Sequence, residues 1–250
     1  MKTVAKIRRI LSPLRKAARE WRLLTKERLQ MLGDEGEPGS VKWLVRREIR
    51  YGGIVHNVPR LKVSDRDGRT PKELSFGGMT GGDRMLHHRY ADIYSRYLIP
   101  FIGRPNLTVI EVGVLKGSGL AIWADLFPNA RIIGLDIDPS HFENNHVELL
   151  RRGAFSQNQP EIHVFDQLQD GPDRMSEILG GRKVDIFIDD GLHSPDAIVS
   201  SLAALRPHLA DDFVVIIEDI GAGALQDIDP FYIRQSDNLI HVLGLKSQGA

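Results

Sequence analysis

The sequence predicts an α/β fold built on a doubly wound, mostly parallel sheet, with a basic helical segment before it and a shortened carboxyl-terminal edge. Three observations lead to this prediction. Short apolar runs alternate with amphipathic stretches from residue 107 onward, which is typical of parallel strands joined by helices. A glycine-rich loop separates the first apolar run from the stretch that follows it. Basic residues are concentrated in the first 50 positions, ahead of this pattern.

The expected elements follow one another at regular spacing after a predicted helix over residues 83–98. The hydrophobic pattern places strands at 107–112, 131–136, 161–165, 184–189 and 213–218, and helices at 118–127, 140–152, 171–180 and 195–209. Residues 231–245 add one or two closing strands. Because few residues follow Asp219, we expect a trimmed or rearranged carboxyl-terminal edge.

Residues 1–75 are expected to form a basic helical extension and linker, and residues 76–250 the sheet domain. Residues 1–50 contain 14 Lys and Arg against 6 Asp and Glu, although the net charge of the whole chain is zero. The pattern predicts an amphipathic helix over 2–32, kinked at Pro13. Such a helix packs on its own domain or on another subunit, or lies on an anionic membrane.

After this helix we expect a linker at 33–40, a short helix at 41–51 and an irregular connection over 52–78 that holds a short strand at 54–58. The basic helix predicted over 2–32 contains one aromatic residue, Trp21, and no recognisable nucleic-acid-reading module, so we expect no nucleic-acid partner.

The composition excludes several classes of protein. The chain has no cysteine, which rules out disulfides and thiolate metal sites and fits a reducing compartment. No apolar run approaches the roughly 18 residues that cross a bilayer, and charges interrupt the apolar runs of the first 30 residues, unlike a secretory signal. We therefore expect a cytoplasmic globular protein.

The glycine loop reads E-V-G-V-L-K-G-S-G and begins at the end of the first predicted strand. Gly113, Gly117 and Gly119 let the backbone turn sharply and approach a ligand, and the following helix directs its free amides at that ligand. Asp136 ends the second predicted strand, 25 residues after Glu111. An acid at about this separation can bind ribose hydroxyls. The segment predicts a site for a nucleoside-containing cofactor.

The glycine spacing distinguishes between cofactors. Dinucleotide folds use G-x-G-x-x-G, whose amides meet a pyrophosphate. Here the order is G-x-x-x-G-x-G with Glu111 before it, and an acid suits an ammonium group better than a pyrophosphate. S-adenosylmethionine carries an ammonium, a sulfonium and a ribose. The pattern favours this cofactor and argues against an NAD-dependent oxidoreductase. The alternative is an ordinary strand–helix turn whose glycines serve packing.

Two later strand ends also carry acids. The run VDIFIDD ends in Asp189 and Asp190 with His193 just beyond, and FVVIIED ends in Glu218 and Asp219. The tips of parallel strands lie on one edge of a sheet, and neighbouring tips lie about 5 Å apart. Carboxylates that close repel one another unless a cation joins them. All-oxygen ligands favour Mg²⁺, with Ca²⁺ and Mn²⁺ as alternatives.

This arrangement suits methyl transfer to a hydroxyl. A divalent cation lowers the pKa of a bound hydroxyl by several units, and His193 is placed to accept the proton. The alternatives are plainer: Asp190 and Asp219 are solvated strand-end acids, His193 is an ordinary loop histidine, and Asp189 only caps the following turn or holds cofactor. Glu218 is harder to explain this way, because a charge after an apolar run is costly unless it is paired.

With DDGLH and VIIEDI following EVGVLKGSG, residues 76–220 resemble the class I S-adenosylmethionine-dependent methyltransferases. They are most similar to the metal-dependent sugar O-methyltransferases of the macrocin and mycinamicin type and to their cephalosporin-hydroxylase-like and rhamnosyl O-methyltransferase relatives. The resemblance implies a Rossmann-like fold. It also implies that Asp190, Glu218 and Asp219 are metal ligands, that Asp190 and His193 are catalytic, and that His193 is the base.

Upstream, GGDRMLHHRYADIY resembles the T-D-K…H-x-Y segment of that family, which closes over the cofactor. Asp83, His88 and Tyr90 match it, whereas Gly82 replaces Thr and Arg84 replaces Lys. The alternative is a surface helix whose tyrosines lie in the core. The third strand ends in Asp166 and Gln167, where relatives contact adenine. The residues expected to bind cofactor are Asp83, Tyr90, Glu111, Gly113, Gly117, Asp136, Asp166, Gln167 and Asp189.

The resulting hypothesis is a Mg²⁺-dependent O-methyltransferase acting on a sugar hydroxyl of a glycan or glycosylated natural product. One alternative is a metal-independent methyltransferase with a carboxylate, phenol or amine acceptor. Another is a non-catalytic cofactor-binding or membrane-associated subunit. Oxygen chemistry is disfavoured, since the sequence lacks a two-histidine iron motif. We also expect a homo-oligomer, with peripheral contact to the inner membrane face through residues 1–32.

Overall fold

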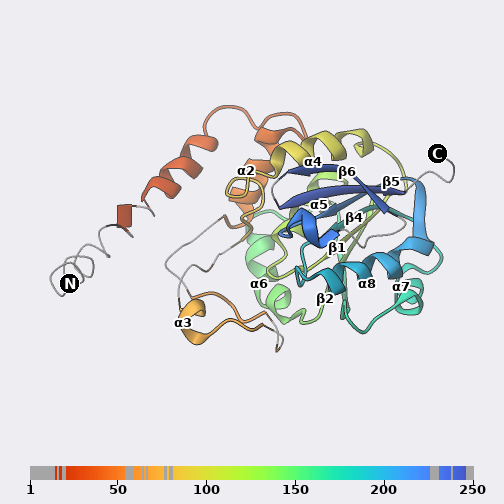
Figure 1. Ribbon diagram of the computed structural model, residues 1–250. Coiled ribbons are helices and arrows are strands. Elements are labelled where there is room, and N and C mark those ends of the chain that lie inside the picture. The colour runs from red at the N-terminus through yellow and green to blue at the C-terminus, as the bar shows by residue number, and fades with distance from the viewer. Residues whose placement is uncertain are drawn as a thin grey trace.

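A computed structural model describes residues 15, 17–18, 21–53, 59–63, 65, 67–75, 78, 81–225, 231–237 and 239–245 (Figure 1). The helices are α2 (Val41–Tyr51), α3 (Pro71–Leu74), α4 (Ala91–Leu98), α5 (Ser118–Leu126), α6 (Ser140–Arg151), α7 (Pro172–Leu179) and α8 (Pro195–Leu205). The strands are β1 (Thr108–Val112), β2 (Arg131–Asp136), β3 (Glu161–Val164), β4 (Val184–Asp189), β5 (Leu209–Ile217), β6 (Phe231–Asp237) and β7 (Ile240–Leu245). Short 3-10 helices span Ile99–Phe101, Arg206–His208 and Ala222–Leu225.

The strands form one seven-stranded sheet in the order β3-β2-β1-β4-β5-β7-β6. The first five are parallel, whereas β7 runs antiparallel to both β5 and β6. The predicted doubly wound, mostly parallel sheet is confirmed. The prediction of one or two closing strands over 231–245 is confirmed, because β6 and β7 complete the sheet as an antiparallel pair. What is short is the connection after β5, where the described residues form only the 3-10 turn Ala222–Leu225.

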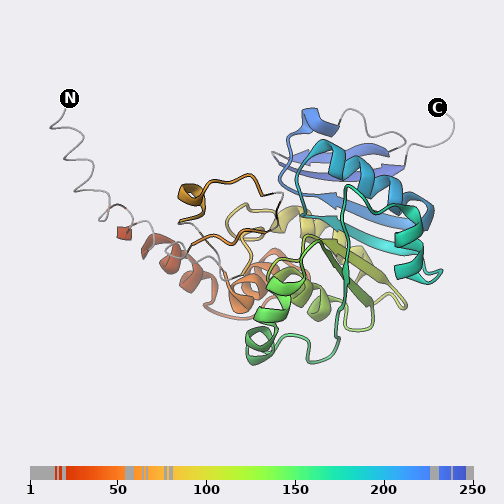
Figure 2. The same cartoon turned by 90° about the horizontal axis from the view of Figure 1, so that it is seen from below.

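Helices cover both faces of the sheet (Figures 1 and 2). Successive strand residues point to opposite faces, so that Val109 belongs to one hydrophobic core and Ile110 to the other. The first core lies under α2, α4, α5 and α6, and the second under α7 and α8. The strands between them are buried on both sides, as expected for a parallel sheet. This three-layer, Rossmann-like arrangement leaves the strand tips open for a site.

Two predicted helices end or begin elsewhere. The helix predicted from residue 83 begins only at Ala91, because residues 84–90 form turns and Arg89 has a positive φ of 65°. The helix predicted to residue 209 ends at Leu205, where Pro207 enters a 3-10 turn. The first of these differences matters for the site, because the turn keeps residues 83–90 above the strand tips.

Residues 21–30 are helical and project from the body of the protein (Figure 1). Most of the helix predicted before residue 21, with its kink at Pro13, lies outside the described residues, as does the strand predicted at 54–58. Within the described part of the chain, no helix is long and apolar enough to cross a membrane.

Helix α2 packs into the first core although it precedes the predicted domain boundary. Ser40 caps the helix by accepting the N–H of Trp43, and both Trp43 and Tyr51 are buried together with residues of α4 and α5. The Tyr51 hydroxyl also donates to Asp125 on α5. The boundary near residue 75 stays a prediction, but α2 shares its hydrophobic core with the sheet.

This packing predicts that α2 unfolds together with the sheet. Trp43→Ala removes a side chain that is 4% exposed, so the free energy of unfolding should fall by about 3–5 kcal/mol. The matched control is Val41→Ala on the same helix, whose side chain is 38% exposed, and which should change the free energy by less than about 1 kcal/mol. Denaturant unfolding followed by circular dichroism measures both. An unchanged main transition in Trp43→Ala would show that α2 is independent of the sheet.

Candidate active site

The sheet brings the tips of β1, β4 and β5 to one edge. In the register Val112 pairs with Asp189, and Asp189 pairs with Ile217. Backbone hydrogen bonds continue past the strands, since Asp190 N–H donates to Val112 and Glu218 N–H donates to Asp189. An open cleft lies beside this edge, between residues 81–84, the loop after β1 and Asp190.

The first loop needs glycine at three positions, because other residues lie too close to its backbone to leave room for a side chain. Gly113 has φ of 84°, and a Cβ there would lie 2.0 Å from the carbonyl oxygen of Asp190. Gly117 caps α5 with φ of 79° and faces Phe142. At Gly119 a Cβ would lie 2.1 Å from Oε1 of Glu111. No side chain fits at these positions without displacement, so the loop can lie against the acidic strand tips.

The guanidinium of Arg84 lies at the centre of the acidic edge. Its Nη1 is 2.7 Å from Oε1 of Glu111, its Nη2 is 2.6 Å from Oδ2 of Asp190, and its Nε is 3.1 Å from Oε1 of Glu218. Arg84 is 6% exposed, and the rings of Tyr94 and Trp123 lie beside it. A planar guanidinium with several donors is suited to join three carboxylates in this way.

Burial and charge act against each other in this cluster. Burial raises the pKa of Glu111 and raises that of Glu218 further, while Arg84 lowers both. Burial opposes the charge of Arg84, but Glu218 and Glu111 raise its pKa well above the ordinary value. The guanidinium therefore stays charged, and it offsets part of the cost of burying the acids around it. Glu111 and Glu218 hold their protons more tightly than they would in water, because their pKa is raised.

A second group lies next to it, formed by Asp190, His193 and Asp219. One ligand atom from each lies within 4.8 Å of the others, a spacing that fits a metal ion. Nε2 of His193 is 3.9 Å from Oδ1 of Asp190. His193 and Asp219 both adopt left-handed backbone conformations, with φ of 54° and 57°. Such conformations are costly for residues other than glycine and concentrate at functional positions.

The structure differs from the sequence prediction at Glu218. This residue was expected to share a metal with Asp190 and Asp219, but its carboxylate is turned to Arg84 and accepts the hydroxyl of Tyr94. Glu218 is 2% exposed, and its neighbours satisfy it without an ion. Metal ligation by Glu218 stays a prediction. To bind the metal, its carboxylate would have to leave Arg84 and turn toward the ion. His193 takes its place in the group that the structure brings together.

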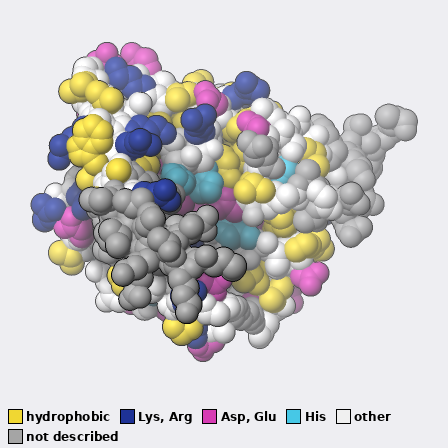
Figure 3. Space-filling view, turned by 60° about the vertical axis from the view of Figure 1, so that its left-hand side comes forward, with side chains coloured by type: hydrophobic (Ala, Val, Ile, Leu, Met, Phe, Trp, Pro, Cys, Tyr) yellow, Lys and Arg dark blue, Asp and Glu magenta, His cyan; other side chains and the backbone are white. Residues whose placement is uncertain are grey.

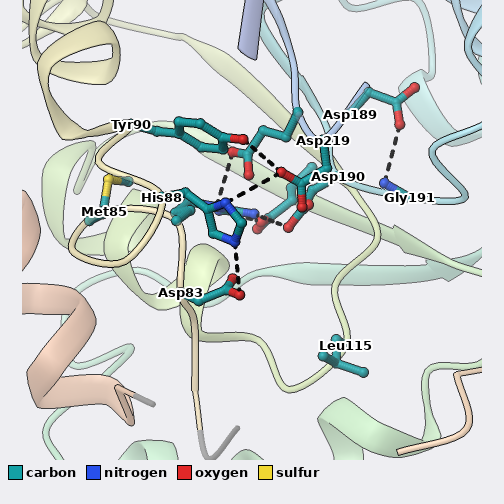
Figure 4. Close-up of polar contacts among 12 residues, drawn as sticks. Asp83, Met85, His88, Tyr90, Leu115, Asp189, Asp190, Gly191 and Asp219 are labelled. Atoms are coloured by element: carbon teal, nitrogen blue, oxygen red, sulfur yellow. Dashed lines mark hydrogen bonds and ion pairs between the residues drawn. The ribbon is translucent and has the colours of Figure 1, made fainter. Parts of the chain in front are cut away.

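The segment 83–90 closes one side of this group (Figure 4). Tyr90 donates its hydroxyl to Asp219 at 2.7 Å, and Nε2 of His88 lies 3.1 Å from Asp83. The hydrogen bond to Asp83 raises the pKa of His88, and Nδ1 of His88 is 3.8 Å from Asp219. Figure 3 shows histidine and acidic side chains next to one another near the centre of this face. The segment contributes both acids and proton-bearing groups to the edge.

Asp189 points away from the group, toward Gly191 (Figure 4). It is 1% exposed, and burial raises its pKa to about 6. Gln167 donates to its carboxylate and accepts the N–H of Leu192, so these two residues support the loop that carries Asp190 and His193. Their predicted contact with cofactor stays a prediction.

The remaining predicted cofactor residues are occupied by local hydrogen bonds. Asp136 accepts the N–H of Leu115 from the glycine loop and the N–H of Asp138. Asp166 accepts the N–H of Leu168. Asp136 therefore lies next to the loop, as the sequence predicted, while its binding of ribose and the contact of Asp166 with adenine stay predictions.

Sequence reasoning did not find the central position of Arg84 or the partners of Glu218. Arg84 stood out only as a replacement for lysine, and nothing in the sequence shows which residues it meets across the fold. Tyr94 and Trp123 lie on helices with ordinary hydrophobic spacing. Trp123 donates its indole N–H to Glu111 at 3.1 Å, a contact that connects residues on two different elements.

The fold and this edge define an α/β protein with a glycine-rich loop beside a group of acids. Comparison with known proteins shows which class of protein the chain resembles. Residues 110–220 match the sequence family described as a methyltransferase domain. The match covers the end of β1, the glycine loop and the strand ends that carry Asp190 and Glu218.

The curated relatives are sugar O-methyltransferases. The mycinamicin VI 2''-O-methyltransferase of Micromonospora griseorubida is 29% identical over 53% of this chain and 32% of its own length. The 8-demethyl-8-alpha-L-rhamnosyl tetracenomycin-C 2'-O-methyltransferase of Streptomyces olivaceus is 26% identical over 56% of this chain and 35% of its own length. The chain thus spans about a third of the length of each of these relatives.

Among solved structures, a methyltransferase of the mycinamycin biosynthetic pathway in complex with Mg, SAH and mycinamycin VI is 28% identical to this chain. The match covers 56% of this chain and 34% of that one, with a TM-score of 0.44.

The Arg84 cluster makes a prediction for stability. Arg84→Met leaves the buried acids Glu111 and Glu218 and the partly exposed Asp190 without their cation, so at pH 7 the free energy of unfolding should fall by about 3–5 kcal/mol. The folded state holds the protons of Glu111 and Glu218 more tightly than the unfolded state, because their pKa is raised. These two groups therefore contribute less to the stability of the native protein as pH rises from about 4 toward neutrality, and this loss should be larger without Arg84.

Urea unfolding at pH 5 and pH 7 measures this effect. Arg84→Met should approach the native protein at pH 5 and fall well below it at pH 7. The control is Arg151→Met, which removes an exposed arginine paired with Glu148 and should leave both values near those of the native protein. Equal losses in Arg84→Met at the two pH values would contradict the charge account.

Proposed function

We propose that this protein is an S-adenosylmethionine-dependent, Mg²⁺-dependent O-methyltransferase that acts on a sugar hydroxyl. The observation that carries the proposal is the juxtaposition of Asp190, His193 and Asp219 with the cleft beside the glycine loop. A cation and a methyl donor held at these two places would lie against the same acidic edge. The relatives named above, whose printed functions are sugar O-methyl transfers, support the reaction class.

The lining of the cleft supports the methyl donor. Glu111 presents a carboxylate and Arg84 a guanidinium side by side. The carboxylate is complementary to the ammonium of the donor's amino-acid end, and the guanidinium to its carboxylate. The loop from Gly113 to Gly117 runs past this pair toward Asp136, whose carboxylate would accept a hydrogen bond from a ribose hydroxyl. The sulfonium would add a further positive charge, which nearby carboxylates would favour.

The acidic group fits a divalent cation, since carboxylate oxygens of Asp190 and Asp219 lie within 4.8 Å of each other. Asp190 and Asp219 would hold the ion, which when bound lowers the pKa of an acceptor hydroxyl. His193 would accept the proton from that hydroxyl, because its ring lies beside Asp190 and is partly open to solvent. Tyr90 holds Asp219 in place, and burial together with Asp219 raises the pKa of Tyr90, so that its hydroxyl remains a donor.

Transfer of a labelled methyl group from S-adenosylmethionine to a panel of glycosides tests this proposal. EDTA should abolish transfer, and Mg²⁺ should restore it. Asp219→Asn and His193→Ala should each lower turnover by about 100-fold or more, while binding of S-adenosylhomocysteine by calorimetry stays close to native. The control is His208→Ala, at the opposite end of β5, which should keep native turnover.

The variants also separate the rival readings. Loss of turnover in His193→Ala with unchanged affinity for Mn²⁺ supports a base, whereas loss of Mn²⁺ binding makes His193 a ligand. Transfer that proceeds equally well in EDTA would reject the metal-dependent mechanism in favour of a metal-independent methyltransferase. Binding of S-adenosylhomocysteine without transfer to any glycoside or cell extract would support a non-catalytic subunit.

We also propose that a homo-oligomer of this enzyme works in the cytoplasm, in peripheral contact with a membrane through residues 1–32. The described part of this segment exposes large apolar side chains, since Trp21 is 68%, Leu29 60% and Leu32 67% exposed. The surrounding residues 1–50 carry an excess of positive charge. Exposed apolar side chains with basic neighbours suit the surface of an anionic bilayer.

A liposome flotation assay tests the membrane contact. The full chain should float with vesicles that contain phosphatidylserine and stay in the dense fraction with neutral vesicles. A chain lacking residues 1–32 should not float with either. Identical behaviour of the two chains would end this proposal, and size-exclusion chromatography with light scattering of the same samples reports the oligomeric state.

A further inference from the structure

Helix α2 contributes a buried acid to the wall of the cleft. Glu48 is 2% exposed, and its two carboxylate oxygens accept the N–H groups of Met85 and Leu86 at 2.8 and 2.9 Å. The same side chain lines the cleft together with Arg84 and Ser118. Glu48 thus stands between an amino-terminal helix and the segment that closes over the candidate site.

The two amides lie at the start of a short turn. The N–H groups of His87 and His88 donate to the carbonyl of Asp83, so Met85 and Leu86 precede the first internal hydrogen bonds of the turn. Amides in this position need an outside acceptor, and a carboxylate also complements the positive end of the turn. Glu48 is that acceptor for both of them.

Backbone contacts hold the same junction from the other side. Gly53 donates its N–H to the carbonyl of Glu48, and Gly81 donates to the carbonyl of Gly53. A Cβ at Gly81 would lie 2.6 Å from the α-carbon of Gly52, so the two chain segments touch directly. At Gly82 a Cβ would lie 3.1 Å from Glu48 and from Ser118. The end of α2 and the start of the closing segment are therefore one packed unit.

The segment held in this way carries several groups of the candidate site. Arg84 immediately precedes Met85 and meets Glu111 and Asp190, while Tyr90 donates to Asp219. The N–H of Tyr90 also donates to the carbonyl of Arg84, which links the two ends of the segment. A shift of the Met85 and Leu86 amides would therefore move both Arg84, which lines the cleft, and Tyr90, which donates to Asp219.

We propose that Glu48 is a positioning residue, which holds Arg84 and Tyr90 in place by fixing the backbone of residues 83–90. Burial raises the pKa of Glu48 to about 7, and the two amides act in the opposite direction. An acid retained against burial is typical of functional positions. The alternative is that Glu48 only stabilises α2.

A matched control separates the two readings. Arg46 lies on the same helix, is 3% exposed and donates to the carbonyls of Gln30 and Gly33. It ties α2 to the preceding turn without touching residues 83–90. Arg46→Met should therefore lower stability without loosening the closing segment, whereas Glu48→Ala should loosen that segment.

The experiment combines hydrogen exchange by mass spectrometry with calorimetry on the full chain. In Glu48→Ala, amides of residues 83–90 should exchange at least about tenfold faster, and S-adenosylhomocysteine should bind about tenfold more weakly. Glu48→Gln keeps one acceptor and the shape of the side chain, so its effects should be smaller and in the same direction. Arg46→Met should speed exchange near residues 30–36 and change the affinity less than about twofold.

The binding readout rests on the proposed function, and the exchange readout does not. If the native protein fails to bind S-adenosylhomocysteine, the proposed cofactor is wrong, and exchange in residues 83–90 still decides the role of Glu48. Unchanged exchange in that segment in both Glu48 variants would overturn the proposal. The proposal would also be overturned by a second outcome. In it, Arg46→Met and Glu48→Ala lower the melting temperature by similar amounts and weaken S-adenosylhomocysteine binding equally.

Discussion

The guanidinium of Arg84 lies below the surface among carboxylates from the ends of three neighbouring strands, β1, β4 and β5. This cation allows Glu111 and Glu218 to be buried next to the partly exposed Asp190, because it offsets the repulsion among carboxylates in a poorly solvated place. Buried ion pairs of this kind contribute little net stability, but they are strongly destabilising when one partner is removed. The arrangement therefore constrains where residues 83–90 and the strand tips can lie.

The position of Arg84 leaves part of the acidic edge available for the proposed metal ion. Arg84 forms ion pairs with Glu218 and with one oxygen of Asp190. Asp219 instead accepts the hydroxyl of Tyr90, and the His193 ring lies near the other oxygen of Asp190. The edge thus separates into a compensated part next to the glycine loop and an acidic part open to a cation. The left-handed backbone at His193 and Asp219 fits this division, since strain is retained where a site needs a particular geometry.

Much of the fold follows from local sequence patterns. The boundaries of β2 and β4 match the predicted ranges, because apolar runs that end in acids mark buried parallel strands well. The convergence of Asp190 and Asp219 also follows from strand order alone. The placement of Arg84 and Glu48 does not, since both depend on contacts between segments far apart in sequence. The same limit explains Glu218, whose partner Tyr94 is 124 residues away.

The central claim is that Asp190 and Asp219 hold a divalent ion next to a methyl donor bound along the glycine loop. A crystal structure of the full chain grown with Mn²⁺ and S-adenosylhomocysteine, with anomalous scattering to locate the metal, tests it most directly. The account predicts a manganese peak in contact with both carboxylates and the nucleoside beside Gly113 and Asp136. A bound nucleoside with no peak at the acidic group, or a metal held elsewhere, would contradict it.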